Sequence, residues 1–260
     1  MPTRAARSFR HEYELFIEQE IENYKESIPR AAILAIGDEA ATRLTSEAQL
    51  VLTEMLLLEE VDKIIAKRIR LPKYESWRRK RLKLHEEMRR PEHWGLSKSD
   101  ALVRTISSRV AKAGTTRHVL VAGESARNAL FLAANGCDVA AVEQEDALQR
   151  VMEAAVQAGL AERVHPVAYE LTQWTPETPL QAVVCSLSAL EVIAPEERAR
   201  VLAVLQSATR DGGVHLVETI AAGSKAIDEL KATYAGWAIS IETSRDDAQV
   251  FLAKKEQPRV

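Results

Sequence analysis

The sequence has few cysteines and no long apolar run. Its 260 residues include only Cys137 and Cys185, too few for a disulfide framework or for a tetrahedral metal site of their own. No stretch reaches the roughly 18 consecutive apolar residues of a membrane span, because Thr53 and Glu54 interrupt the densest run, 51–58. The arginines of residues 1–10 precede no apolar segment, which argues against a secretory signal. We therefore expect a cytoplasmic, soluble protein with reduced thiols and no membrane contact.

Several catalytic and metal-binding patterns are also absent. No Gly-x-Ser-x-Gly motif occurs, which argues against a hydrolase built on a nucleophile elbow. No set of His, Cys and carboxylate residues has the spacing of metal ligands, so we expect no metal site. His165 and His215 fall within strand-like patterns and are interpreted as packing or edge residues.

Charge is distributed unevenly along a chain whose net charge is −3. Residues 1–114 carry 22 Lys and Arg against 18 Asp and Glu, whereas residues 115–260 carry 13 against 20. Twelve of the basic residues lie between Lys63 and Arg90, with only three acidic residues among them. This asymmetry indicates two regions with different roles, and we place the boundary between residues 114 and 115.

The first region, 1–114, is predicted to be entirely helical. Apolar residues at spacings of three and four predict a helix over 9–27. Ser46 and Gln49 resemble a capping box at the start of a second helix, which Pro72 ends. Further helices are expected over 73–90 and from Ser97 or Ser99 to Gly114. No strand pattern precedes residue 117.

The second region, 115–260, alternates between short apolar strands and helices. Strands are predicted at 118–122, 138–142, 164–168, 181–186 and 214–218. Helices are predicted at 127–135, 147–158, from Pro195 to near Asp211, and at 224–234, followed by a hairpin of 237–242 with 249–253. Strands that alternate with helices at this spacing form a parallel, doubly wound α/β sheet.

Three stretches of this region resemble one family. The run 127–143 reads Arg-Asn-Ala-Leu-Phe-Leu-Ala-Ala-Asn-Gly-Cys-Asp-Val-Ala-Ala-Val-Glu, and it is similar to the arginine-asparagine run and following strand of tellurite-resistance-type methyltransferases. Residues 211–218 resemble the Pro-Gly-Gly turn and fifth strand of the same superfamily, and 186–190 resemble the segment after its fourth strand. Over about 117–255 the chain therefore resembles a class I S-adenosylmethionine-dependent methyltransferase. The resemblance implies a Rossmann-like methyltransferase sheet, mostly parallel with an antiparallel last strand, behind an all-α N-terminal domain.

The resemblance also implies a cofactor, S-adenosylmethionine, and a place for it. Ligands of doubly wound sheets bind beyond the carboxyl ends of the strands, at the point where the strand order reverses. Glu143 would accept the ribose hydroxyls, Tyr169 and Glu170 would lie beside the adenine, and Ser186 would lie near the methionine end. The positions assigned to cofactor binding are Ala122, Gly123, Glu124, Asn128, Glu143, Gln144, Tyr169, Glu170 and Ser186. No catalytic residue is predicted, because methyl displacement depends mainly on in-line positioning of donor and acceptor.

The first turn departs from the family pattern of an acid followed by three glycines at alternate positions. When the chain is aligned from Arg127 without gaps, the acid position holds Leu120. The glycine positions hold Ala122, Glu124 and Ala126, and Gly123 lies between them. Glu124 either crowds the cofactor or holds its amino group in place of the missing acid.

Three functions follow from these observations. The favoured one is methyl transfer to an O, N or S nucleophile of a small molecule. The others are a non-catalytic methyltransferase-like scaffold with a helical protein- or RNA-binding module, and an RNA methyltransferase steered by the basic segment 63–90.

The basic segment itself has two interpretations. Arg78-Arg-Lys-Arg81, with Tyr74 and Trp77 nearby, has the composition of a phosphate-contacting and base-stacking surface. The same residues also fit a solvated helix face, and this second interpretation is favoured because the whole chain is mildly acidic. In the resembling family such helical extensions often cover the pocket or mediate association, which makes a homo-oligomer through the helical domain a further expectation.

Overall fold

The computed structural model describes residues 8–45, 53–107, 117–123, 126–221, 224–243 and 248–256. The chain divides into two compact units between Leu84 and His85, about 30 residues before the boundary placed from charge and helix patterns. The residues that follow Leu84 pack with the sheet, since Leu102 and Val103 lie in its core. No helix in the described ranges is long and apolar enough to cross a bilayer.

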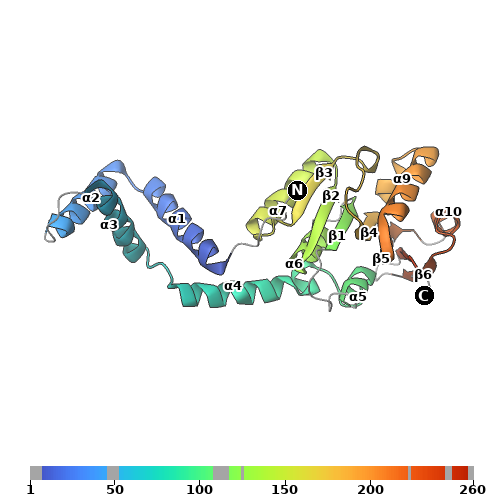
Figure 1. Ribbon diagram of the computed structural model, residues 1–260, viewed down its shortest axis with the longest axis horizontal. Helices are drawn as coiled ribbons and strands as arrows, with labels where there is room; N and C mark the ends of the chain where they lie inside the picture. The colour runs from blue at the N-terminus through green and yellow to red at the C-terminus, as the bar shows by residue number, and fades with distance from the viewer. Residues whose placement is uncertain are drawn as a thin grey trace. The chain divides into compact units, whose positions relative to one another are not determined.

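The helical unit contains α1 (Phe9–Ser27), α2 (Arg30–Thr45), α3 (Thr53–Arg68) and the first part of α4 (Tyr74–Met88) (Figure 1). No strand occurs among its described residues, as predicted. Ser8 caps α1, its hydroxyl accepting from the His11 amide at 3.2 Å. The separate helix α2 was not foreseen, and the proposed capping box at Ser46 and Gln49 lies outside the described residues.

Two groups of side chains hold the helical unit together. A small apolar core joins α1, α2 and α3 and consists of Ile21, Ile36, Ala40, Ile64 and Ile65. An aromatic cluster joins α1 to α4 and consists of Tyr13, Phe16, Tyr74 and Trp77, with ring centroids 5.4 to 6.5 Å apart. The Tyr13 hydroxyl also donates to the Pro72 carbonyl at 2.9 Å, so the cluster fixes the start of α4 against α1.

The second unit is built on one seven-stranded sheet. Its strands are β1 (Arg117–Ala122), β2 (Cys137–Val142), β3 (Val164–Ala168), β4 (Leu180–Ser186), β5 (Thr209–Ile220), β6 (Ala238–Thr243) and β7 (Gln249–Lys254). They run in the order β3-β2-β1-β4-β5-β7-β6. Strands β1 to β5 pair in parallel, and β7 pairs antiparallel with both β5 and β6. The predicted sheet and its terminal hairpin are therefore confirmed.

Helices cover both faces of this sheet (Figure 1). The helical segments of the unit are η1 (Pro91–Trp94), α5 (Ala101–Ser107), α6 (Ala126–Ala134), α7 (Glu145–Gln157), η2 (Leu171–Gln173), α8 (Leu187–Glu191), α9 (Pro195–Ala208) and α10 (Ala226–Thr233). Because successive strand residues point to opposite faces, Val119 and Val121 of β1 pack with α5, α6 and α7, whereas Leu120 packs with α8, α9 and α10. The central strands β1, β4 and β5 are thus buried on both sides, as expected for parallel strands with continuous apolar runs.

Candidate functional site

The strand order reverses between β1 and β4, and the turns after these two strands meet there. Ala122 ends β1 and is completely buried. Gly123 follows it at φ +78°, and its amide donates to the Val142 carbonyl at 3.2 Å. A Cβ at Gly123 would lie 2.2 Å from the Ser186 Oγ atom and 2.7 Å from the Ala189 Cβ. Only glycine fits both the backbone conformation and the space.

The turn variants can be compared directly. We expect Gly123→Ala to lower the free energy of unfolding clearly more than Gly236→Ala. Gly236 has a similar φ of +88° but nothing within 4 Å of its missing Cβ, so its alanine variant reports the left-handed strain alone, about 1–2 kcal/mol. Urea unfolding of both variants provides the measurement, and equal losses would show that Ser186 and Ala189 move aside freely.

Two further assignments in this turn have different outcomes. Glu124 lies outside the described residues. Whether its side chain crowds the cofactor or binds the cofactor's amino group therefore stays a prediction. Leu120, which occupies the family's acid position, is fully buried in the core beneath α8 and α9. It therefore contributes packing and cannot replace the missing acid.

Glu143 stands immediately after β2, as the sequence predicted. Its side chain is only 4% exposed. The bond from the Gly123 amide to the Val142 carbonyl places the end of β2 beside the turn after β1. Gln144 occupies the N-cap position of α7, and its exposed side chain makes no capping bond. A buried carboxylate thus lies at the reversal of strand order, where a ribose would be bound.

The other assigned residues lie at the same edge of the sheet. Tyr169 and Glu170 follow β3; Tyr169 is 53% exposed, and Glu170 accepts from the Thr172 hydroxyl at 3.2 Å. Ser186 ends β4 and caps α8, with its Oγ atom accepting from the Ala189 amide at 3.3 Å. The Ser186 and Ser188 hydroxyls also lie 2.7 Å apart. The structure therefore gives Ser186 a capping role in addition to its predicted place near the cofactor.

Asn128, in the first turn of α6, contacts Glu218, a residue that the sequence analysis did not assign to the site. Its side chain is 1% exposed, and its Nδ2 atom donates to the Glu218 Oε2 atom at 2.6 Å. Its Oδ1 atom is buried and finds no hydrogen-bond partner among the described residues. The signal for Glu218 was available, since it is an acid at the end of the predicted strand 214–218. Nothing in the sequence indicated its contact with a residue 90 positions away.

Burial raises the pKa of the Glu218 carboxyl above the usual glutamate value. The Asn128 hydrogen bond and the nearby Arg127 act in the opposite direction, and the charge of Asp100 adds to the increase. This carboxyl therefore holds its proton more strongly than an exposed glutamate does.

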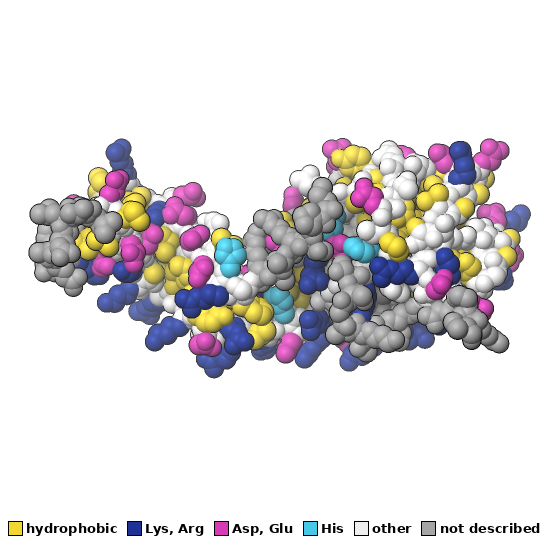
Figure 2. Space-filling view, viewed as in Figure 1, with side chains coloured by type: hydrophobic (Ala, Val, Ile, Leu, Met, Phe, Trp, Pro, Cys, Tyr) yellow, Lys and Arg dark blue, Asp and Glu magenta, His cyan; other side chains and the backbone are white. Residues whose placement is uncertain are grey.

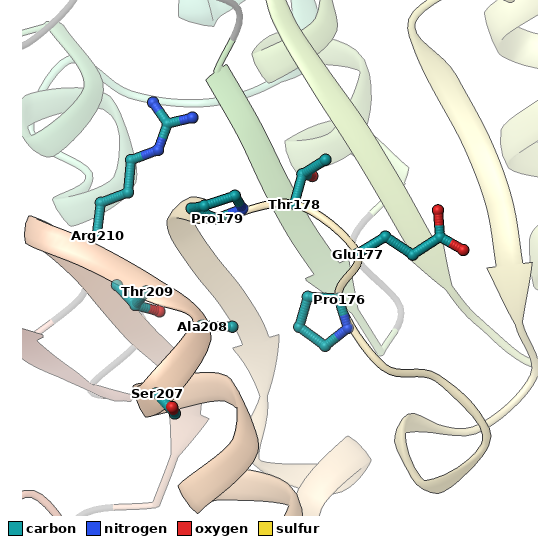
Figure 3. A pocket seen from close by; sticks show the side chains of 8 residues that line it. All are labelled: Pro176, Glu177, Thr178, Pro179, Ser207, Ala208, Thr209 and Arg210. Atoms are coloured by element: carbon teal, nitrogen blue, oxygen red, sulfur yellow. The ribbon is translucent and has the colours of Figure 1, made fainter. Parts of the chain in front are cut away.

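Two cavities among the described residues of the sheet unit are centred away from Glu143 and Asn128. One, of about 260 Å³, is lined by Pro176, Glu177, Thr178, Pro179, Ser207, Ala208, Thr209 and Arg210. It lies at the amino ends of β4 and β5, opposite to Ser186 and Glu218, and the side chains of Glu177 and Arg210 point in different directions there (Figure 3). The other, of about 100 Å³, lies between α8, α9 and α10.

The histidines in strands have the structural roles expected from their patterns. His165, on the edge strand β3, has its Nε2 atom 2.6 Å from an Asp138 oxygen, and His118 Nδ1 lies 3.0 Å from the other oxygen. Within the described ranges no group of His, Cys, Asp and Glu has the arrangement of a metal site. His215 is completely buried between Thr209 and Tyr234.

Comparison with known proteins gives relatives by structure and none by sequence. No protein-family model matches the chain, and no curated protein matches its sequence. Among solved structures, a candidate rRNA methylase from Clostridium thermocellum matches with a TM-score of 0.50 at 15% identity, over 62% of this chain and 99% of that one. At this identity the likeness shows the fold: the sheet unit has the methyltransferase fold.

Two other similar structures have lower TM-scores. The glycopeptide N-methyltransferase MtfA matches with a TM-score of 0.46 at 13% identity, over 60% of this chain and 90% of that one. TehB from Haemophilus influenzae matches with a TM-score of 0.46 at 17% identity, over 59% of this chain and 62% of that one.

Proposed function

We propose that this protein is an S-adenosylmethionine-dependent methyltransferase that acts on an O, N or S nucleophile of a small molecule. The observation that carries the proposal is the buried carboxylate of Glu143, which directly follows β2 beside the Gly123 turn in a sheet of methyltransferase fold. Solved structures of the similar protein MtfA include complexes with S-adenosylmethionine, S-adenosylhomocysteine and sinefungin, which supports the choice of cofactor.

The residues at this edge of the sheet fit such a cofactor. Glu143 offers two carboxylate oxygens, which suit the two ribose hydroxyls. The buried Oδ1 atom of Asn128 has no partner among the described residues, so a donor such as the cofactor's amino group would satisfy it. Tyr169 and Glu170 border the place for the adenine, and Ala122, Gln144 and Ser186 complete the surroundings.

When bound, the cofactor would supply a methyl group on a positively charged sulfonium sulfur, for transfer to the acceptor's nucleophilic atom with the carbon–sulfur electron pair left on sulfur. The acceptor loses the proton of its nucleophilic atom. The chain contributes chiefly by holding both partners in line, an effect worth up to about 7–11 kcal/mol in well-oriented reactions.

Calorimetric titration with S-adenosylmethionine and S-adenosylhomocysteine tests the proposal. We expect both to bind at one site per chain. The rival, a non-catalytic scaffold, predicts no binding at millimolar cofactor. It also predicts that replacing Ala122, Glu124 and Ala126 by glycine would create measurable binding by returning space and backbone freedom. That pair of results would exclude the enzyme.

An RNA acceptor is the second candidate, and the exposed basic residues of α4 favour it. Arg78, Arg79 and Lys80 are exposed, whereas Arg81 is paired with Glu12 at 3.5 Å. Lys and Arg side chains gather over this helix in Figure 2. A polyanion would neutralise such a row of cations and release its counterions.

Our preference for a small molecule predicts no submicromolar binding of single-stranded RNA at physiological salt. If RNA is the acceptor, binding should fall with salt by a log–log slope of about −0.7 per phosphate contact. Replacing Arg78, Arg79 and Lys80 by alanine should then reduce that slope by about 2. The matched control replaces three exposed cations elsewhere, Lys98, Arg150 and Lys225, and should leave the slope unchanged. Fluorescence anisotropy with a labelled RNA distinguishes the two candidates.

A further inference from the structure

The carboxyl end of β5 presents an acid beside the proposed cofactor site. Glu218 pairs in register with Ser186, the last residue of β4. Ser186 in turn lies against the Gly123 turn that follows β1. Glu218 therefore lies near the end of β5, the strand next to β4. Glu143 follows β2, on the other side of β1 and β4. Because Ser186 is the residue assigned to the methionine end of the cofactor, Glu218 lies beside the position proposed for the reacting methyl group.

The Glu218 side chain is fixed in position by a neighbour from another element. The Asn128 amide, which is 99% buried, donates from α6 to the Glu218 Oε2 atom at 2.6 Å. The other atom of that amide, Oδ1, has no partner among the described residues. Buried polar atoms are normally satisfied. With the cofactor's amino group as the donor to Oδ1, the same amide would hold the Glu218 carboxylate beside the cofactor.

The backbone at Glu218 is irregular as well. The pairing of β5 with β7 shifts register between Val217 and Ile220, which marks a bulge. Within it, Thr219 has φ +62°, a conformation that is unfavourable for a β-branched residue. Bulges redirect side chains and are common beside active sites, and strained residues persist where their surroundings impose them. The strand thus departs from regular geometry at the position of its only carboxylate that faces α6.

We propose that Glu218 binds the methyl acceptor and that the acceptor is an amine. The inference deepens the proposed function and depends on it. Two features support the position: the hydrogen bond from Asn128 and the bulge at Thr219.

The charge of the site selects the nucleophile. An amine in water is largely an ammonium ion, which a carboxylate attracts, whereas an alcohol or a thiol brings no charge. The ammonium must also lose one proton to free the lone pair that attacks the methyl carbon. Burial and the charge of Asp100 raise the pKa of Glu218, and together they outweigh the opposite effects of Asn128 and Arg127. The carboxylate is therefore a better proton acceptor than an exposed glutamate. The proton passes from nitrogen to Glu218, and the nitrogen then bonds to carbon as the carbon–sulfur bond breaks.

Ligand-observed NMR with matched probes tests the proposal. Propylamine and benzylamine, each paired with the alcohol and the thiol of the same shape, are titrated into the parent and into Glu218→Gln. The glutamine variant keeps the side-chain size and an oxygen for Asn128. We expect amine affinity to fall about 10- to 100-fold in the variant, with alcohol and thiol binding unchanged. In the parent, amine affinity should also decrease as pH falls through the Glu218 pKa, and the variant should lack this dependence.

Two controls separate the possible failures. Glu196→Gln, on the exposed start of α9, should leave amine binding and its pH dependence unchanged, and circular dichroism verifies that each variant is folded. Amines that bind the parent no better than alcohols, or equally well to Glu218→Gln, would overturn the amine site. Calorimetry with S-adenosylhomocysteine is carried out separately. A parent that binds amines at Glu218 but binds no cofactor would overturn the proposed function instead.

Discussion

Replacing Glu143 by alanine should weaken S-adenosylmethionine binding by about tenfold to a hundredfold. The carboxylate would accept hydrogen bonds from both ribose hydroxyls, and loss of a charged acceptor costs on the order of 1.5–3 kcal/mol. The effect should be large here because Glu143 is only 4% exposed, so water replaces the lost bonds poorly. Calorimetric titration of the parent and the variant measures the difference directly.

The neighbouring Glu145 provides the matched control for this experiment. It lies two residues later, in the first turn of α7, and its side chain is exposed. Glu145→Ala should therefore bind the cofactor as the parent does. If Glu143→Ala also retains the parent's dissociation constant, the ribose is bound elsewhere and the assignment of Glu143 is wrong.

The succession of strands and helices along the chain was predictable, because the first five strands are short apolar runs and helical patterns lie between them. The predicted start of β5 was wrong, and the error is instructive. Asp211-Gly-Gly213 suggested a helix end, but β5 begins at Thr209. The Gly212 amide donates to the Lys255 carbonyl, and the Lys255 amide donates to the Gly213 carbonyl, each at 3.0 Å. Pairing with the distant end of the chain therefore overrides the local turn signal.

The site was predictable only in part, and the reason is topological. Glu143 follows a strand directly, and in a doubly wound sheet the end of a strand near the reversal of order is a binding position. The Asn128–Glu218 contact could not be predicted, because it depends on β5 lying two strands from β1 and on a bulge that no local pattern announced. The apolar residues of α5 gave a similar difficulty. They predict a helix, but not that the helix packs into the sheet core.

His215 connects the sheet to α10 through a buried network whose protonation can be deduced. The Thr209 hydroxyl donates to the Leu205 carbonyl at 2.7 Å, so it accepts from His215 Nε2, which lies 2.7 Å away. The Nδ1 atom is then the unprotonated one, and it accepts from the Tyr234 hydroxyl at 2.7 Å. A proton added at Nδ1 would face that hydroxyl donor in a fully buried place. Burial, with a further contribution from Lys255, accordingly lowers the pKa of His215 from 6.5 to about 3.

The low pKa of His215 predicts a loss of stability in mild acid. In the unfolded chain the imidazole takes up a proton below pH 6.5, whereas in the folded protein it stays neutral down to about pH 3. The unfolded state therefore binds more protons in this window. From this residue alone, the free energy of unfolding at pH 5 should be about 2 kcal/mol lower than at pH 7. Urea unfolding of the parent should show this decrease in the free energy of unfolding between pH 7 and pH 5. In His215→Gln, whose side chain does not titrate, the decrease should be smaller by about 2 kcal/mol. Parent and variant with the same pH dependence would mean that His215 is protonated in the folded protein, and the deduced direction of the Tyr234 hydrogen bond would be wrong.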